Sequence, residues 1–254
     1  SHAGQHARER GKRPGRSGQQ HGDERQRAGP ATRGLAVAMG LRPERALLND
    51  LNAHVINFYR WLQRGLRIER PMANARTRYD AARDRFNGLL ESGQGDTAEA
   101  AGLFYYLNRT GYNGLCRFNR RGRFNVPFGR YAKIAYQRDF AEYRPAFAGW
   151  EFTSTPFEAV PMAPDDFVYA DPPYDVPFTQ YASVAFGWDA QVRTARWLAR
   201  HPGPVVLSNQ ATPRIQDLYA SLGFRLVLIE APRRISCTGD RTPAREIMGT
   251  RNLS

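Results

Sequence analysis

The sequence predicts an α/β protein in which helices cover both faces of a sheet. Strand-like and helix-like patterns alternate through the second half of the chain, which is typical of this class. The 254 residues are enough to bury a core without disulfides or metal ions. Apolar residues make up 41% of the chain, yet no stretch approaches the roughly 20 consecutive apolar residues of a membrane span. We therefore expect a globular protein with no membrane partner.

Residues 1–34 differ from everything that follows. They hold eight basic and three acidic residues, and four alanines are their only aliphatic side chains apart from proline. Such a segment cannot bury enough apolar surface to offset the entropy lost on folding. We expect it to be disordered or not native to the fold, as a truncated or frame-shifted start would be.

Local patterns predict the first elements. Residues 46–48 are a short apolar run that ends in Asn49–Asp50, as in a buried strand whose polar end faces a ligand. Residues 52–64 carry apolar side chains at helical spacing, and His54 is expected on the surface of that helix. Residues 70–100 are polar and rich in alanine, which indicates two helices joined by a loop.

The remaining elements alternate. A hairpin is predicted over 117–126 with its turn at Gly122. Strands are predicted at 166–170, 204–208, 224–230 and 245–250, and helices at 188–200 and 212–222. In sheets of this kind, ligands bind beyond the carboxyl ends of the strands.

The charge balance indicates the class of partner. The chain has 37 Lys and Arg against 24 Asp and Glu, a net charge of +13, and only Lys12 and Lys133 are lysines. Arginine binds phosphate in bidentate geometry and stacks on nucleobases. A nucleic acid is therefore the expected partner. The alternative is an arginine-rich composition whose charges are merely solvated.

The segment 100–138 strengthens this prediction. It contains eight basic residues, nine aromatic residues and no acidic residue. Basic side chains contact phosphates and aromatic rings stack on bases, so their interleaving is typical of nucleic-acid binding. The alternative is that the rings belong to the core and the arginines to a solvated face.

The clearest chemistry lies in Asp171-Pro172-Pro173-Tyr174, directly after the strand at 166–170. The exocyclic amino group of a base is a poor nucleophile, because its lone pair is delocalised into the ring. An Asp carboxylate and a carbonyl beside a proline can each accept one of its N–H bonds, while Tyr174 stacks on the base. A base in a duplex must be extruded to reach such a pocket. The alternative is a rigid turn after a strand.

The motif Asp171–Tyr174 resembles the catalytic motif of amino-directed methyltransferases that use S-adenosylmethionine. Three further stretches, at 46–59, 104–131 and 231–246, match the pattern of the Dam-type DNA adenine methyltransferase family. The chain is therefore identified as a member of that family, from about residue 41 to its end. The stretch at 104–131 is the most specific of these matches.

The resemblance implies a Rossmann-like, S-adenosylmethionine-dependent methyltransferase sheet with an inserted, mainly helical DNA-recognition domain that carries the hairpin. The catalytic domain is then expected over 35–64 and 146–254, and the recognition domain over 65–145. The implied activity is site-specific methylation of the exocyclic amino group of an adenine flipped out of duplex DNA. GATC is the commonest target in the family.

The resemblance also implies a role for each site residue. Asp171, Pro172, Pro173 and Tyr174 would hold the flipped adenine, and Asp171 would also border the cofactor. Asp50 would bind the ribose hydroxyls of the cofactor, and Phe157 would pack on its adenine. The DNA-binding candidates are Arg109, Asn113, Arg117, Phe118, Asn119, Arg120, Arg121, Arg123, Arg130 and Lys133.

Within the hairpin, Phe118 and Asn119 would fill the base stack at the vacated position. Arg121 or Arg123 would read a guanine edge, the commonest direct contact of arginine with a base. Phosphate contacts are expected from Arg109, Arg130 and Lys133.

The sequence departs from the family ahead of Asp50. A Trp-x-Gly-Gly-Lys segment and a Phe-x-Gly-x-Gly cofactor loop should both precede it, but the first tryptophan here is Trp61 and the first phenylalanine is Phe58. Pro156 stands where the family commonly has Asp beside the aromatic residue of the cofactor site. We therefore expect the first core strand to be missing or unrecognisable, and S-adenosylmethionine to bind weakly or not at all.

Two alternatives stay open. One is a catalytically silent DNA-binding fragment of such an enzyme, and the other is a methyltransferase acting on cytosine, RNA adenine or a protein glutamine. The two cysteines, Cys116 and Cys237, are too far apart in sequence for a metal-type pair or a disulfide framework, so no metal is expected. The resemblance implies a cytoplasmic monomer of a bacterium or phage, in a setting such as restriction–modification.

Overall fold

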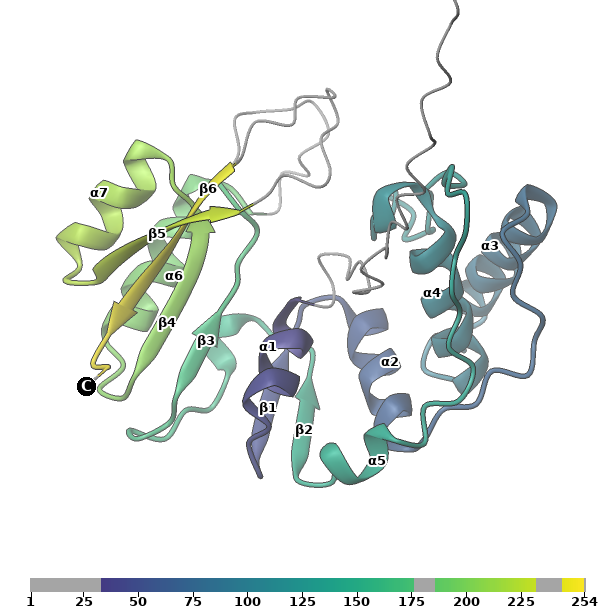
Figure 1. Cartoon of the computed structure of the whole chain (residues 1–254), viewed down its shortest axis with the longest axis horizontal. Helices are drawn as coiled ribbons and strands as arrows, with labels where there is room; N and C mark the ends of the chain where they lie inside the picture. The colour runs from purple at the N-terminus through teal and green to yellow at the C-terminus, as the bar shows by residue number, and fades with distance from the viewer. Residues whose placement is uncertain (1–32, 176–185, 232–243, 254) are drawn as a thin grey trace, which may run out of the picture.

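The computed structural model describes residues 33–175, 186–231 and 244–253. Helices from the first part of the chain gather in one half of the molecule, a four-stranded sheet with two later helices lies in the other, and a short strand pair lies between them (Figure 1). Of the segment expected to be disordered, residues 1–32 lie outside the described residues. So do most of the third matching stretch and Cys237.

The described part of the fold begins with α1 (Arg33–Leu41), β1 (Ala46–Asn49) and α2 (Ala53–Gln63), so α1 includes the last two residues of the segment expected to be disordered. α2 starts where Asn52 caps it, because the Asn52 side chain accepts a hydrogen bond from the backbone N–H of His54 at 3.0 Å. The apolar stripe of α2 is buried, as its spacing predicts.

The helical half consists mainly of α3 (Arg76–Glu91) and α4 (Ala98–Thr110), followed by the short turns η2 (Tyr112–Gly114) and α5 (Tyr143–Ala146). Thr97 caps α4, since its hydroxyl accepts a hydrogen bond from the N–H of Ala100 at 3.2 Å. The prediction of two helices joined by a loop is confirmed, although α4 runs about ten residues further than expected.

The second half contains the predicted strands and helices in the predicted order, preceded by one strand and one short turn that were not predicted. Its elements are β2 (Trp150–Thr153), η3 (Phe157–Ala159), β3 (Val168–Ala170), α6 (Trp188–Ala199), β4 (Val205–Gln210), α7 (Pro213–Ser221), β5 (Arg225–Ala231) and β6 (Ala244–Arg251). Thr212 caps α7 and Pro213 stands at its start, where the missing N–H of proline costs no helical hydrogen bond.

The strands form two separate sheets. β1 pairs in parallel with β2. β3 pairs in parallel with β4, and β6 lies antiparallel between β4 and β5. In Figure 1, β2 and β4 point the same way, so both parallel pairs present their carboxyl ends at one side of the molecule.

This arrangement is mixed α/β and consistent with a methyltransferase fold, but it differs from the single sheet that the resemblance implies. Within the described residues no ladder joins β1 to β3, and no strand precedes β1. β1 and β3 therefore each keep one edge without a ladder in this part of the chain. Residues 1–32 lie outside the described residues, so the absence of the first core strand stays a prediction.

Two hydrophobic clusters lie on either side of this break. One runs from Leu35 to Phe152 and joins α1, β1, β2 and the helical half, and the other runs from Ala195 to Ile247 under the four-stranded sheet. Leu62 and Leu66 belong to the same cluster, so the predicted domain boundary after residue 64 does not coincide with a gap in the core. The division into catalytic and recognition domains stays a prediction.

Candidate active site and nucleic-acid interface

The motif Asp171–Tyr174 directly follows β3, at the carboxyl edge where the fold class places ligands. The Ser208 hydroxyl on the neighbouring strand β4 donates to Asp171 Oδ1 at 2.6 Å. β3 and β4 are in parallel register, which brings the two side chains to the same edge. One carboxylate oxygen of Asp171 is thus hydrogen-bonded to a side chain of the sheet.

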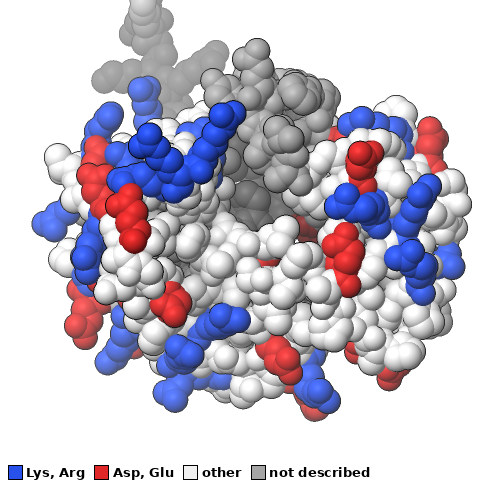
Figure 2. Space-filling model, turned by 180° about the vertical axis from the view of Figure 1, so that it is seen from behind, with Lys and Arg blue, Asp and Glu red and all other residues white. Residues whose placement is uncertain are grey.

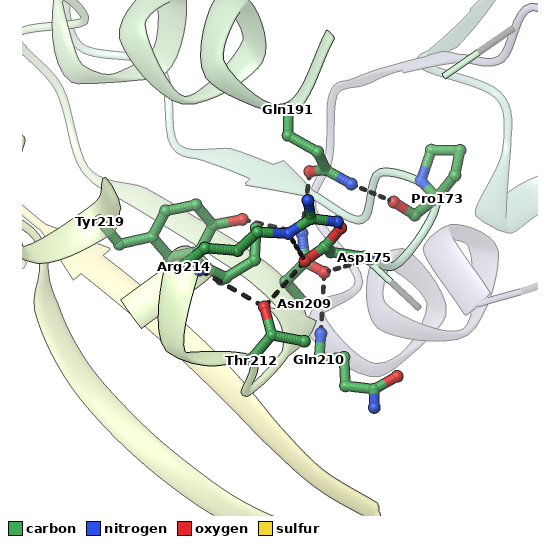
Figure 3. Close-up of polar contacts among 9 residues, drawn as sticks. Pro173, Asp175, Gln191, Asn209, Gln210, Thr212, Arg214 and Tyr219 are labelled. Carbon is green, nitrogen blue, oxygen red and sulfur yellow. Dashed lines mark hydrogen bonds and ion pairs between the residues drawn. The ribbon is translucent and has the colours of Figure 1, made fainter. Parts of the chain in front are cut away.

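The backbone after this aspartate is held by two buried amides (Figure 3). Gln191 of α6 donates through Nε2 to the carbonyl of Pro173 at 2.6 Å, and Asn209 of β4 accepts the N–H of Asp175 at 2.9 Å. Asn209 Nδ2 also donates to Gln191 Oε1 and to the Tyr219 hydroxyl, each at 3.0 Å. The two amides therefore form one connected network.

Asp175 carries an ion pair that the sequence analysis missed. Its buried carboxylate accepts hydrogen bonds from the Thr212 hydroxyl at 2.8 Å and from Arg214 Nε at 2.6 Å, and Arg214 Nη2 also contacts it. The Arg214 guanidinium lies 4.8 Å from the centre of the Trp188 ring. Two features of the sequence could have indicated this contact: an aspartate directly after the motif, and polar residues at the end of the apolar strand predicted at 204–208.

Tyr174 lies in the chain between Pro173 and Asp175, whose backbone atoms are held by Gln191 and Asn209. Its hydroxyl donates to Glu246 Oε2 of β6 at 3.2 Å. The loop residues Asp171–Asp175 are consequently held by partners from β4, α6, α7 and β6, which are far apart in the sequence.

Asp50, the candidate for the cofactor ribose, directly follows β1, and the carboxyl ends of β1 and β3 lie at the same side of the molecule (Figure 1). Its Oδ1 accepts the backbone N–H of Asn52 at 2.8 Å. Burial raises the pKa of the Asp50 carboxyl, and the hydrogen bond from Asn52 offsets this in part. Such a carboxylate, partly removed from water, is suited to accept hydrogen bonds from a ligand.

Phe157 lies in η3, after β2. Its ring packs edge-on against Trp197 of α6, with the ring centres 5.3 Å apart, and it stays partly exposed. An aromatic surface is therefore present near the carboxyl end of β2, and its packing on a cofactor stays a prediction.

The predicted hairpin is confirmed. Phe118 and Phe124 form an antiparallel bridge, and the N–H of Asn119 donates to the carbonyl of Arg123 at 2.9 Å. Gly122 has φ of 71°, which glycine adopts without a steric penalty. Asn87 of α3 exchanges two hydrogen bonds with the backbone of Phe124, at 2.7 and 3.1 Å. The base of the hairpin is thereby fixed to the helical half.

Some polar side chains of the hairpin have hydrogen-bond or ion-pair partners in the described residues, and others have none. Arg117 donates to Asn125, and Arg123 forms an ion pair with Glu91 at the end of α3. Arg120 and Arg121 are exposed, and in the described part of the chain no side-chain partner of either was found. Asn119 is exposed too, but its Oδ1 accepts the backbone N–H groups of Arg121 and Arg123 and shapes the turn.

Phe118 is half-buried rather than projecting. Its ring lies 4.9 Å from that of His54 and 5.6 Å from that of Phe124. The expectation that His54 lies on the helix surface was wrong, because its ring also contacts Phe86 and Phe104, and burial lowers its pKa. The sequence could not show this, since the hairpin that covers His54 is some sixty residues away.

The other basic candidates lie around the hairpin. Arg109 is half-buried and donates to the carbonyl of Ala135 at 3.0 Å, whereas Arg130 and Lys133 are exposed. Asn113 has a left-handed backbone, with φ of 54° in η2. Figure 2 shows Lys and Arg side chains gathered over the end of the helical half.

Two features are absent from the residues that the structure describes. No helix among them is long and apolar enough to cross a membrane. Nor does that part of the chain contain a group of three or more His, Cys, Asp or Glu residues arranged to hold a metal ion.

The mixed α/β fold and the Asp-Pro-Pro-Tyr loop at its carboxyl edge define the class, that of the methyltransferases. The sequence model of the D12 class N6 adenine-specific DNA methyltransferases matches residues 34–235. The chain belongs to this family and is an adenine-specific DNA methyltransferase by that membership.

Curated relatives agree. The chain is 34% identical to the "DNA N-6-adenine-methyltransferase" of Escherichia phage P1 over 87% of its length, but it spans only 31% of that longer protein. It is 33% identical to the "Retron Ec67 DNA adenine methylase" of Escherichia coli, covering 86% of this chain and 80% of the relative. The "DNA adenine methylase" of Vibrio cholerae is 34% identical, with 77% and 76% covered. A methyl donor and a DNA substrate follow from the family.

Proposed function

We propose that the chain transfers a methyl group from S-adenosylmethionine to the exocyclic amino nitrogen of an adenine flipped out of duplex DNA. This proposal rests on which hydrogen-bond acceptors of the motif are already occupied by protein donors. Asp171 Oδ1 is taken by Ser208, and the Pro173 carbonyl is taken by Gln191. Among the described residues, Asp171 Oδ2 and the Pro172 carbonyl have no donor, so they are the two acceptors left for a substrate.

Two acceptors suit an amino group, which has two N–H bonds. Hydrogen bonds from both N–H groups, to Asp171 Oδ2 and to the Pro172 carbonyl, turn the nitrogen lone pair away from the protein and toward a methyl carbon held in line. The new N–C bond forms as the methyl group leaves its sulfur, and the amino nitrogen then releases one proton, for which Asp171 Oδ2 is the adjacent base. Catalysis is by position, with Tyr174 stacked on the base.

The cofactor's ribose end has a fitting residue. Asp50 keeps one carboxylate oxygen without a donor in the described residues, and burial makes that charge costly unless it is hydrogen-bonded. Asp50 would hold the ribose hydroxyls, and Phe157 would pack on the adenine ring. S-adenosylmethionine supplies an electrophilic methyl group when it is bound.

The hairpin is proposed as the element that enters the DNA. Arg121 would read a guanine edge, because its guanidinium is exposed, whereas that of Arg123 is committed to Glu91. Arg130 and Lys133 are exposed as well and would contact phosphates. GATC is proposed as the target sequence by the resemblance alone.

The experiment that tests this follows two steps in one sample. Calorimetry measures binding of S-adenosylmethionine to the full chain, and a labelled methyl group is then followed into unmethylated plasmid DNA. Binding together with label in N6-methyladenine supports the proposal. Label in cytosine, RNA or protein instead would replace it with another amino-directed activity.

A second function is favoured by one observation. The described residues contain neither a strand nor a glycine-rich loop ahead of β1. If the methionine end of the cofactor has no support, the chain holds DNA without modifying it. DNA binding by filter assay, with no calorimetric signal from S-adenosylmethionine, would establish this alternative.

A further inference from the structure

Two buried amides hold the backbone on both sides of Tyr174. Before it, the Pro173 carbonyl accepts from Gln191 Nε2 at 2.6 Å, and after it, the Asp175 N–H donates to Asn209 Oδ1 at 2.9 Å. The dashed contacts in Figure 3 run unbroken from Tyr219 through Asn209 and Gln191 to Pro173. Neither amide belongs to the motif Asp171–Tyr174.

Asn209, at the centre of this network, has all of its hydrogen-bonding groups paired. Asn209 is fully buried, and Gln191 is 3% exposed. Asn209 donates to Gln191 and Tyr219, and its Oδ1 accepts from the backbone N–H groups of Asp175 and Gln210, so the whole amide is satisfied. A buried amide that is fully hydrogen-bonded favours one geometry, because a different arrangement would leave one of its polar groups unpaired.

We infer that Gln191 and Asn209 are positioning residues for methyl transfer, which set the path of the loop and thereby aim the Pro172 carbonyl and the Tyr174 ring at the base. This rests on the proposed function, because it assigns these two amides a part in that reaction. Gln191 also occupies the Pro173 carbonyl and so keeps a third acceptor from competing for the amino group. Neither residue touches the substrate, since both act through backbone atoms of the loop.

The first test is Gln191→Glu in the full chain. The carboxylate keeps an acceptor for Asn209 but places a negative charge against the Pro173 carbonyl. We expect the single-turnover rate on unmethylated plasmid DNA to fall by about 10- to 100-fold, the range for a small misplacement of reacting groups, with the Kd for DNA unchanged. A rate equal to that of the parent chain would overturn the inference.

The matched control is Gln63→Glu. Gln63 is also a helical glutamine whose Nε2 donates to backbone carbonyls, of Phe147 at 2.7 Å and Trp150 at 2.8 Å, but these lie on the other side of the sheet break. It should keep the parental rate once stability is matched. An equal loss in both variants would mean that Gln191 matters only for folding, and would overturn the inference.

A second variant, Tyr219→Phe, removes only the hydroxyl at the far end of the network and keeps the buried ring. Hydrogen exchange of the Tyr174 and Asp175 amides then measures how tightly the loop backbone is held, whether or not the chain transfers methyl groups. Faster exchange at these amides in Gln191→Glu and Tyr219→Phe, but not in Gln63→Glu, is the expected result. Unchanged exchange would overturn the inference. Altered exchange in a chain that transfers no methyl group would uphold the positioning and reject the proposed function.

Discussion

The loop Asp171–Asp175 and the hairpin Arg117–Asn125 are built in opposite ways. The loop has little structure of its own and is held by side chains from β4, α6, α7 and β6. The hairpin is stabilised by its own backbone hydrogen bonds and by the Asn119 side chain, which shapes the turn at Gly122, and it is tied to the helical half at Phe124. Its arginines at positions 120 and 121 are left exposed.

The difference matches two different tasks. A reacting amino group tolerates little error in position, so a loop that aligns it gains from partners that leave no freedom. A surface that reads base edges needs side chains that reach outward from a stable support. Each region can therefore be altered by mutations that leave the other intact.

The largest expected effect is on the loop. Asp171→Ala removes one of the two proposed acceptors, and transfer should fall by about 100- to 1,000-fold, as when a preorganised transition-state contact is lost. DNA binding should remain, because Asp171 is not part of the hairpin. Single-turnover kinetics and filter binding check this. Equal loss of both activities would mean that Asp171 is structural.

The next prediction compares the anchoring of the two regions. Asp175→Asn weakens a buried, charged contact with Arg214, and should lower the free energy of unfolding by about 1.5–3 kcal/mol. Arg117→Ala removes an exposed contact with Asn125 and should cost less than about 1 kcal/mol. Urea denaturation measures the free energy of unfolding of both variants. Similar losses in the two would mean that the loop and the hairpin do not differ in how they are anchored.

A third prediction separates two arginines of the hairpin. Arg121→Ala should relax one position of the target sequence by about 1–3 kcal/mol, if its free guanidinium reads a guanine. Arg123→Ala should change affinity for all sequences alike, because that side chain pairs with Glu91. Competition binding with single-base variants of GATC measures both. If only Arg123→Ala lost discrimination between target bases, Arg123 would be the residue that reads the guanine, and not Arg121.

The smallest effect concerns His54 beneath the hairpin. Burial lowers its pKa, so the unfolded chain takes up a proton first as the pH falls below the ordinary value of 6.5. The folded state therefore loses stability from pH 6.5 downward, until its own lower pKa is passed. His54→Phe keeps a ring against Phe118 and removes this loss. Thermal melts between about pH 7 and 5 should show a shallower fall in Tm for the variant. Identical slopes would mean that the His54 ring is solvated.

Much of the fold could be predicted from the sequence, because its cues are local. Apolar spacing located α2 and α6, and the turn at Gly122 located the hairpin. The position of Asp171 after a strand was also predictable, since Asp-Pro-Pro-Tyr follows an apolar run directly.

The partners of the motif could not be predicted in this way. Gln191 and Arg214 reach the loop from helices that meet it only in the folded chain. Likewise, the packing of Phe118 on His54 depends on how the hairpin folds over α2. Spacing rules describe neighbours along one element, and these contacts join different ones.

The hairpin tip also bears on how the target sequence can evolve. Its shape comes from Asn119, Gly122 and the backbone, whereas Arg120 and Arg121 make no side-chain contact that stabilises the described fold. Exposed substitutions of this kind usually change stability by less than about 0.5 kcal/mol. A lineage can therefore sample new side chains at both positions one mutation at a time, without passing through an intermediate that fails to fold.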